Sequence, residues 1–410
     1  MNKKLKLFIK KIMKNYAAVF GLGPYQIYGI KKLSQKYKLI GFDKNNNAPG
    51  IKYTSKFYNL EKINKFEILD ICKKKNIVKF FCFSSDFSIK LINFLKKKLN
   101  LENPNNQAEI TSFNKLLFRN IIKKSGIDSP YFKEIKLEEA NKIKLKKGFK
   151  YICKPLDLSG SRGVFTFNDK KDLIKSLQKN ESYYTNQNKI LIEEFIEGQM
   201  YSIEGFYFKN NFLPICVNKN YKEIKYSLAN KSILINYQNS KILNEAKKLA
   251  NQCCKAIKLK YAPIHLEFII QNKTKKIYPI EIGLRGAGTY IYGTYLPIIL
   301  KKNTAALEID LKENEKILNL KNNSDKQIYL YFISARKNMI FKKLNIKLLK
   351  EKLRMPFEVK ILKENNTEII LKNSADDRVA LVVFKFDTYK NFKKNYSKID
   401  KTMQVNNFII

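Results

Sequence analysis

Short apolar runs alternate with longer amphipathic stretches in the N-terminal quarter of the chain. The apolar runs have the length and the aromatic or β-branched content of buried strands, and they lie at residues 17–20, 38–42 and 77–83. Helical patterns follow the first and the third run, at residues 25–36 and from about Ser88. Because strands that alternate with helices form parallel sheets, the pattern predicts a small doubly wound α/β domain over residues 1–104.

The pattern changes after Asn103 and Pro104, which are typical of a break between elements. Strands and helices then follow without strict alternation: a capped helix that opens at residues 111–115, a strand at residues 151–155, a strand leading into a turn at residues 189–198, a strand at residues 201–208, a helix at residues 244–257, and strands at residues 327–333 and 379–386. A Lys- and Asn-rich stretch begins after residue 310. We therefore expect a mixed α+β domain at residues 105–310 and a small C-terminal α+β subdomain at residues 311–410.

Two apolar segments, residues 265–270 and 276–282, flank a polar turn and predict a β-hairpin. If the turn centres on Thr274, Glu267 and Glu281 lie seven residues to either side of it and face each other on one side of the sheet. Two opposed carboxylates repel unless a cation lies between them, and Mg²⁺ takes oxygen ligands of this kind. The alternative is a register shifted by one residue, which would turn one glutamate to solvent.

Residues 158–164, Leu-Ser-Gly-Ser-Arg-Gly-Val, form a loop of small residues between two strand-like runs. Glycines allow backbone N–H groups to converge on an anion, and the hydroxyls and Arg162 add hydrogen-bond donors. The loop therefore suits a triphosphate, although it lacks the Gly-Lys-Ser/Thr ending of a P-loop. The alternative is a plain hairpin turn.

The 410-residue chain carries 80 Lys and Arg residues against 36 Asp and Glu, a formal net charge of +44. A charge of this size attracts polyanions. The lysines, however, are scattered along the whole chain and accompany many Asn, Ile, Phe and Tyr residues and no Trp, as in proteins from AT-rich genomes. We therefore interpret the charge as compositional and do not expect nucleic acid as a partner.

The six cysteines include no CxxC pair and lie mostly in apolar surroundings, which indicates buried free thiols and a cytoplasmic protein. No apolar run approaches the length of a membrane span. Residues 1–14 are basic, but the apolar segment after them is too short for a signal sequence. It leads into Gly21-Leu22-Gly23, which with Asp43 imitates a dinucleotide fingerprint whose third glycine is replaced by Gln26.

Six short motifs follow the N-terminal α/β pattern in a fixed order. They are a capped helix with Lys115, Cys-Lys154-Pro155, Ser-Gly-Ser-Arg-Gly, Ile-Glu193-Glu-Phe-Ile, His-Leu-Glu267-Phe and Ile-Glu281-x-x-x-Arg285. This order resembles the ATP-grasp superfamily, in particular the branch of carbamoyl-phosphate synthase large chains, biotin carboxylases and amino-acid ligases. The resemblance covers about residues 16–300 and implies a pre-ATP-grasp domain at residues 1–104, an ATP-grasp domain at residues 105–310 and the small C-terminal subdomain.

The resemblance implies a nucleotide site. Lys115 and Lys154 match the two lysines that hold ATP phosphates in the family. The loop residues that match the segment closing over the triphosphate are Ser159, Gly160, Ser161, Arg162 and Gly163. Glu193, Glu194 and Ile196 match the hinge that reads adenine.

The resemblance also implies a metal site and a phosphoryl-transfer site. Glu267 and Glu281 match the carboxylates that bind Mg²⁺ or Mn²⁺, in agreement with the hairpin argument. Arg285 matches an arginine that steadies the acyl-phosphate, for which fixed positive charge on several oxygens is needed. Two positions depart from the family pattern: Gly283 replaces an Asn that often binds metal, and Met200 replaces an acidic residue that often contacts ribose.

The implied reaction is ATP-dependent ligation. A carboxylate attacks the γ-phosphate, ADP is released, and an amine, or in some relatives a thiol-type nucleophile, displaces phosphate from the acyl-phosphate. The implied partners are small-molecule carboxylate and amine substrates, and relatives commonly form homodimers. From their place in the order, residues 214–237, with Lys219, Lys222 and Lys225, are expected to border the acceptor pocket.

Some alternatives stay open at this point. His265, the single histidine of the chain, is either a general base or a residue that supports Glu267. A second enzyme class is a bicarbonate-activating carboxylase or a carbamoyl-phosphate-forming enzyme. A third interpretation is a basic, non-catalytic nucleotide or nucleic-acid binder that has kept the fold.

Overall fold

The computed structural model describes residues 15–24, 26–83, 86–103, 105–184, 189–223, 227–314, 320, 322–405 and 408–410. Residues 1–14, Tyr25, Pro104 and Lys225, which are named above, lie outside the described residues.

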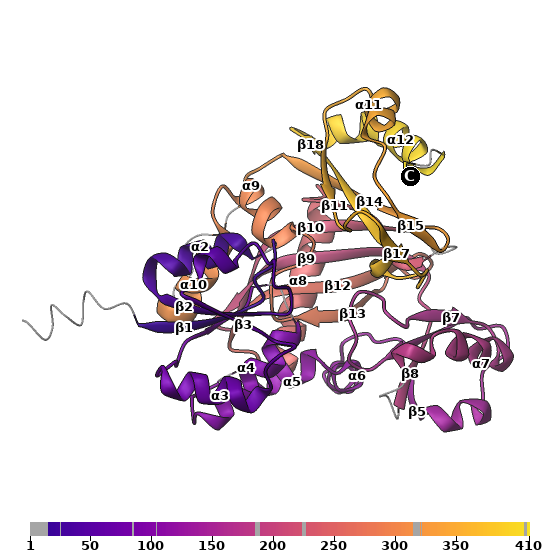
Figure 1. The fold of residues 1–410 in the computed structure, drawn as a ribbon. Helices are drawn as coiled ribbons and strands as arrows, with labels where there is room; N and C mark the ends of the chain where they lie inside the picture. Colours follow the sequence, from indigo (N-terminus) through magenta and orange to yellow (C-terminus); the bar gives the residue numbers. More distant parts are fainter. Residues whose placement is uncertain are drawn as a thin grey trace, which may run out of the picture.

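The N-terminal region is a parallel sheet with helices packed against it, as the strand–helix alternation predicts (Figure 1). Its strand order is β3-β2-β1-β4. The elements, in chain order, are β1 (Tyr16–Phe20), α2 (Ile27–Lys36), β2 (Lys38–Asp43), the short 3-10 helix η1 (Ile51–Tyr53), β3 (Lys56–Asn59), α3 (Lys65–Lys74), β4 (Phe80–Phe81) and α4 (Asp86–Lys98). The predicted third strand at residues 77–83 is paired only over Phe80 and Phe81.

The glycine turn after β1 is occupied by the protein's own side chains. The Leu22 N–H donates to the Asp43 carboxylate at 2.5 Å, and the Gln26 amide oxygen accepts from the Phe83 N–H at 3.0 Å. A Cβ atom at Gly21 would lie 2.1 Å from the Gln26 amide nitrogen. The Gln26 side chain therefore fills the space over the turn, which disfavours a dinucleotide site here.

The next region carries a four-stranded antiparallel sheet with strand order β5-β8-β6-β7. Asn114 caps the helix that begins at Lys115, because its side chain accepts a hydrogen bond from the Leu117 N–H. The elements are α5 (Asn106–Ser112), α6 (Lys115–Lys124), β5 (Phe132–Lys136), η2 (Leu137–Lys142), β6 (Tyr151–Pro155), β7 (Phe165–Phe167), α7 (Lys170–Lys179), η3 (Glu181–Tyr183) and β8 (Lys189–Glu194).

An eight-stranded antiparallel sheet forms the largest part of the molecule, with strand order β13-β12-β9-β10-β11-β14-β18-β16. Helix α8 packs on β9 and β10, and the apolar positions Ala246, Leu249, Ala250 and Cys253 are buried there as expected. The elements up to residue 314 are β9 (Gly198–Phe208), β10 (Asn211–Glu223), β11 (Ser227–Ile235), α8 (Ser240–Ala256), β12 (Tyr261–Gln271), β13 (Ile277–Gly283), the π-helical turn η4 (Ile291–Tyr295), α9 (Leu296–Leu300) and α10 (Thr304–Asn314).

The C-terminal strands extend this same sheet, because β14 pairs with β11 and β18 pairs with β14. The expected boundary at residue 310 falls within α10, which packs on α2 of the N-terminal region. The remaining elements are β14 (Gln327–Ser334), β15 (Met339–Phe341), α11 (Ile346–Leu353), β16 (Glu358–Ile361), β17 (Thr367–Ile369), the 3-10 turn η5 (Ala375–Asp377), β18 (Arg378–Phe386) and α12 (Tyr389–Val405).

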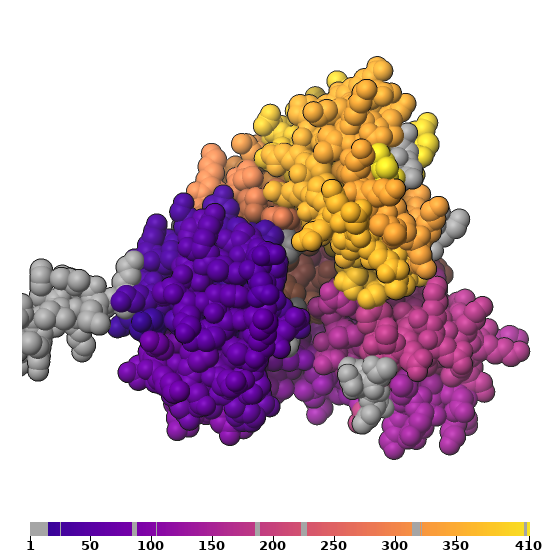
Figure 2. Space-filling model, in the orientation of Figure 1, coloured from indigo at the N-terminus to yellow at the C-terminus, as the bar shows by residue number. Residues whose placement is uncertain are grey.

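The N-terminal region, the four-stranded sheet and the C-terminal strands surround a hollow, which Figure 2 shows between the indigo, magenta and yellow surfaces. The six cysteines are free and buried, as predicted. In the part of the chain that the structure describes, no helix combines the length and apolar character needed to cross a membrane.

Candidate active site

A cavity of about 380 Å³ lies between the four-stranded sheet and the end of the large sheet formed by β9, β12 and β13. Every site residue named from the sequence lines this cavity except Arg162 and Gly163. These lining residues are Lys115, Lys154, Ser159, Gly160, Ser161, Glu193, Glu194, Ile196, His265, Glu267, Glu281 and Arg285. Motifs spread from Lys115 to Arg285 are therefore brought to one place.

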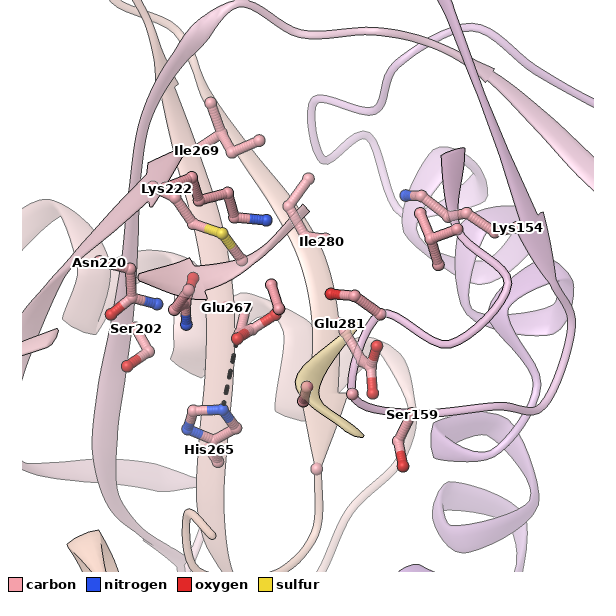
Figure 3. Close-up of a pocket in the computed structure, with 18 of the residues that line it drawn as sticks. Lys154, Ser159, Ser202, Asn220, Lys222, His265, Glu267, Ile269, Ile280 and Glu281 are labelled. Carbon is pink, nitrogen blue, oxygen red and sulfur yellow. Dashed lines mark ion pairs between the residues drawn. The ribbon is translucent and has the colours of Figure 1, made fainter. Parts of the chain in front are cut away.

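The two candidate metal carboxylates, Glu267 and Glu281, are paired directly across β12 and β13. They point into the same space in Figure 3, where Lys222 and Lys154 lie to either side. The hairpin argument predicted this opposition. A β-bulge beside Glu267 contributes to it, since the register shifts between Glu267 and Phe268.

The donor set around the two glutamates fits a magnesium ion. Within the described ranges, no group of three or more His, Cys, Asp or Glu side chains is placed to hold a metal. Mg²⁺ commonly uses only one or two protein carboxylates and completes its shell with water and nucleotide phosphates. Gly283, which replaces the Asn found in many relatives, lines the cavity with no side chain. Glu267 and Glu281 are thus the protein ligands that this site offers.

Two basic groups approach the glutamates. The Lys115 ammonium lies 3.7 Å from a Glu281 oxygen and donates to the Leu158 carbonyl at 2.5 Å. Lys222 also lines the cavity, and burial lowers its pKa while the charge of Glu267 opposes that shift. The sequence order placed Lys222 near the acceptor pocket. Lys219 lies instead over the rings of Tyr221 and Tyr237.

His265 lies between two carboxylates. Its Nδ1 is 2.7 Å from Glu204 Oε1, and its Nε2 is 3.8 Å from Glu267 Oε1, the ion pair drawn in Figure 3. Burial disfavours the charged ring, but Glu204 and Glu267 together raise the pKa of His265 to about 10. A ring that carries both protons at neutral pH holds Glu267 in place and has no nitrogen available as a base. The geometry favours the supporting role.

Glu204 belongs to a buried polar network that sequence reasoning missed. Its Oε1 accepts hydrogen bonds from Ser202 and Asn218 at 3.2 and 3.1 Å, besides its contact with His265. Alternation along β9 places Ser202 and Glu204 on the same face as Glu267, because Ser202 pairs with Glu267 and Glu204 with His265. An acidic residue within an apolar strand was the signal that could have identified it.

Glu193, matched above to the adenine hinge, is buried in an ion triad. Its carboxylate accepts from Arg119 Nε at 2.6 Å and from Lys154 Nζ at 2.5 Å. Burial would raise the pKa of Glu193, but the charges of Arg119 and Lys154 lower it to about 2. Arg119 also donates to the Pro279 carbonyl at 2.6 Å, so the triad connects α6, β6 and β8 to the hairpin that carries Glu281. The Glu193 side chain is therefore engaged in holding Lys154.

The hinge after β8 is held by its backbone. The Glu194 N–H donates to the Tyr131 carbonyl and the Phe195 N–H to the Lys150 carbonyl, both at 2.9 Å. Phe195 and Ile196 line the cavity beside Met200, so this end of the cavity is apolar and bounded by strand backbone. Such a surface suits the flat face and polar edge of a purine. Met200 leaves no acidic ribose contact at its own position.

The loop at residues 158–164 lies along the cavity, and three of its residues have left-handed backbone conformations. Gly160, Ser161 and Gly163 have φ angles of 71°, 59° and 66°. The Gly163 carbonyl accepts from the Tyr184 hydroxyl at 2.5 Å. Arg162 is not among the residues that line the cavity, and its guanidinium binds Asp376, a residue of the C-terminal region.

A small antiparallel sheet that faces the end of a larger one, with opposed glutamates and paired lysines between them, is the ATP-grasp arrangement. Residues 147–292 match the ATP-grasp domain. This match assigns an ATP-grasp domain to that part of the chain.

A curated relative is similar in sequence over part of its length. A D-alanine–D-alanine ligase from Prochlorococcus marinus (strain MIT 9215) is 27% identical over 161 residues, which are 37% of this chain and 43% of that enzyme. The match thus spans less than half of the relative's length.

Solved structures share the fold over nearly the whole chain. An L-amino acid ligase from Bacillus licheniformis superposes with a TM-score of 0.78 at 14% identity, covering 95% of this chain and 97% of that one. N5-carboxyaminoimidazole synthetase from Staphylococcus aureus, in complex with ADP, gives 0.69 at 14% identity, covering 94% and 97%. The biotin carboxylase domain of Hydrogenobacter thermophilus 2-oxoglutarate carboxylase also gives 0.69, at 12% identity, covering 97% and 91%. The N-terminal α/β domain, the ATP-grasp sheets and the C-terminal strands are all part of this shared fold.

Proposed function

We propose that the chain is an ATP-dependent carboxylate–amine ligase that activates a carboxylate as an acyl-phosphate. The observation that carries the proposal is the direct opposition of Glu267 and Glu281 on a cavity wall that also bears Lys115 and Arg285. Opposed carboxylates destabilise a sheet, so their presence in a cavity is best explained by a bound cation. The similarity to the L-amino acid ligase and to the D-alanine–D-alanine ligase supports an amine acceptor.

Each residue has a stated task in this proposal. Glu267 and Glu281 would hold Mg²⁺, which supplies charge neutralisation at the phosphate oxygens when bound. Lys115 and Lys154 add positive charge along the triphosphate, and Arg285 donates to the oxygens of the transferring phosphoryl group. Ser159, Gly160 and Ser161 cover the phosphates and exclude water, which would hydrolyse the acyl-phosphate.

Several supporting residues position these groups. His265, bound to Glu204, fixes the orientation of Glu267. Glu193 and Arg119 fix Lys154, and residues 194–196 border the purine. The catalytic work assigned to protein groups is positioning and charge stabilisation, which is what phosphoryl transfer requires.

Strands β10 and β11 bring polar groups to the cavity that suit an amine. The side-chain oxygens of Asn220 and Asn230 are buried in the lining of the cavity without a hydrogen-bond partner. Unpaired amide oxygens accept hydrogen bonds from N–H donors, so a bound amine would satisfy them. Arg285 and Arg378 on the same cavity provide the charge needed for a substrate carboxylate.

The test is ADP release from Mg-ATP with pools of amino acids, other carboxylic acids and bicarbonate added in turn. Release that depends on an amino-acid pool, with a new C–N bond detected by mass spectrometry, supports the ligase. Release with bicarbonate alone would favour a carboxylase or carbamoyl-phosphate-forming enzyme. Nucleotide binding with background release in every pool, unchanged by Glu281→Gln, would favour a non-catalytic binder.

A further inference from the structure

The glycine-rich loop, residues 158–164, is bound to a segment more than two hundred residues away in the sequence. The Arg162 guanidinium makes a two-pronged ion pair with Asp376: Nε lies 3.0 and 3.2 Å from the two carboxylate oxygens, and Nη2 lies 3.0 Å from Oδ1. The Ala375 N–H donates to the Gly160 carbonyl at 3.4 Å. In Figure 2 the C-terminal surface rests on the magenta region that carries this loop.

The segment that binds the loop is itself a fixed turn. We call residues 374–377 the C-terminal turn. Ser374 and Asp377 form a reciprocal capping box, in which Ser374 accepts from the Asp376 N–H and Asp377 accepts from the Ser374 N–H. Both side chains are buried, and Asp377 also accepts from the Lys372 N–H at 2.9 Å. The turn therefore presents Asp376 from a rigid support.

The C-terminal turn also reaches the cavity. Ala375 lines the cavity beside Ser159, Gly160 and Ser161. Arg378, the residue that follows the C-terminal turn, lines the cavity as well and donates to the Asn230 carbonyl of β11 at 2.9 Å. One short segment thus connects the glycine-rich loop with β11.

The matching of charge and geometry distinguishes this pair from an incidental surface contact. A guanidinium that meets a carboxylate with two parallel N–H groups is restrained in orientation as well as distance. The hydrogen bond to Asp376 raises the pKa of Arg162. Burial alone would raise the pKa of Asp376, but the hydrogen bond and the charge of Arg162 outweigh burial and lower it. Both groups are charged across the neutral range.

We propose that Arg162 and Asp376 form a latch that holds the glycine-rich loop closed over the nucleotide. They are positioning residues: Arg162 acts through the loop and Asp376 through Arg162, and neither contacts the reacting atoms. Breaking the latch lets the loop open more often, so that nucleotide leaves sooner and water reaches the acyl-phosphate. This last consequence rests on the proposed ligase function, whereas the latch itself does not.

The first experiment measures hydrogen exchange in ligand-free protein, in peptides that cover residues 158–164. Asp376→Asn and Arg162→Gln each raise amide exchange there by about fivefold, the ratio expected from loss of a partly exposed ion pair. The double variant shows no further rise, because either change alone already breaks the pair. Asp157→Asn is the matched control: it removes the Lys90–Asp157 pair next to the loop, at 3.3 Å, and leaves exchange in the loop unchanged.

The second experiment measures dissociation of a fluorescent ATP analogue. Both single variants speed dissociation by about fivefold, again without addition in the double variant. Exchange that stays at the wild-type rate in Asp376→Asn, or effects that multiply in the double variant, would overturn the latch. Faster dissociation with Arg162→Gln but not with Asp376→Asn would overturn it too, because Arg162 would then contact phosphate directly.

The two proposals can fail separately. If exchange responds as expected but no substrate pool elicits ADP release, the latch is supported and the ligase proposal fails. If ADP release depends on substrate but the variants leave loop exchange unchanged, the ligase is supported and the latch fails. In an active ligase, breaking the latch also raises the ADP formed per molecule of ligated product, which a general loss of stability would not do.

Discussion

Glu267 and Glu281 face each other because β13 carries one extra residue, Ile280, at a β-bulge. This bulge lies on the side of the glutamate pair that is nearer to the hairpin turn. Near the turn the register pairs Phe268 with Pro279, and its continuation would place Ile280 opposite Glu267. Glu281 would then lie opposite Leu266 and point to the other side of the sheet. With the bulge, Ile280 and Glu281 both line the cavity. The bulge therefore turns an ordinary hairpin into a site with two carboxylates.

Neutralising either glutamate should abolish nucleotide turnover while leaving the fold intact. Glu267→Gln and Glu281→Gln keep the size of the side chain but remove a negative charge from the proposed metal site. We expect substrate-dependent ADP release to fall by about 100-fold or more in each variant. Melting temperatures should change little, because the repulsion removed between the two carboxylates offsets the loss of the Lys115–Glu281 or the His265–Glu267 ion pair.

Glu197→Gln is the control for these variants, since Glu197 is exposed and follows the hinge outside the cavity. It should retain wild-type ADP release. Raising the Mg²⁺ concentration should restore part of the activity of the Glu267 and Glu281 variants. Full activity in either variant at ordinary Mg²⁺ would contradict the assignment of these residues to the metal.

Removing the charge of Glu193 should destabilise the protein strongly, because Arg119 and Lys154 would keep buried positive charges without a partner. The side chains of all three are almost completely buried. Breaking a buried ion pair from one side costs about 3–5 kcal/mol. Urea unfolding of Glu193→Gln should show this loss, against a change within about 0.5 kcal/mol for Glu197→Gln. An equal, small effect in both variants would show that the triad contributes little.

The same carboxylate should give a characteristic dependence of stability on pH. The pKa of Glu193 is about 2 in the folded protein against an ordinary value of 4.5. Because the folded-state pKa is depressed, its stabilising contribution is complete above pH 4.5 and is lost as the pH falls toward 2. The difference in unfolding free energy between wild type and Glu193→Gln should therefore shrink by roughly 3 kcal/mol over that range. A difference that stays constant from pH 5 to pH 2.5 would contradict the depressed pKa.

Local sequence signals were sufficient for the α/β start of the chain and for the hairpin with Glu267 and Glu281, whereas the other cavity residues named from the sequence depended mainly on the family resemblance. The buried runs of β1 and β2 and the capping residue Asn114 act over a few neighbours, so their pattern can be read directly. The opposition of Glu267 and Glu281 was predicted by centring the turn on Thr274. That prediction gave the correct pair although the strands pair one residue out of the predicted register near the turn. The extra residue at the bulge, Ile280, restores the predicted register at Glu267 and Glu281.

Contacts between residues that lie far apart in the sequence could not be predicted from it. Arg119 binds Glu193 across 74 positions and Arg162 binds Asp376 across 214, and nothing local to either arginine indicates its partner. The family resemblance therefore assigns the Glu193 side chain to adenine binding, whereas in the structure its carboxylate contacts Arg119 and Lys154. In the same way, the pairing of β14 with β11 depends on contacts between distant strands, so the continuity of the large sheet with the C-terminal strands gave no sequence signal.

The loop glycines should differ in how they tolerate alanine. Gly160 and Gly163 both have positive φ, at 71° and 66°, but a Cβ atom at Gly160 would have only Ala375 nearby, at 3.8 Å. A Cβ atom at Gly163 would lie 2.9 Å from both Pro155 Cγ and Tyr183 Cβ, atoms that cannot easily move aside. Gly160→Ala should cost about 1 kcal/mol for the backbone alone, and Gly163→Ala about 2–4 kcal/mol, because steric overlap is added.

Gly148→Ala provides the reference for backbone strain without contact, since Gly148 has φ of 82° and nothing within 4 Å of its Cβ position. We expect Gly148→Ala to match Gly160→Ala in urea unfolding but to leave the KM for ATP unchanged. Gly163→Ala should raise that KM, because the overlap displaces the loop that covers the triphosphate while Glu267 and Glu281 remain in place. If all three variants lost the same stability and none altered the KM for ATP, the backbone conformation of the loop would have no part in nucleotide binding, and the covering role given to residues 158–164 would have to be withdrawn.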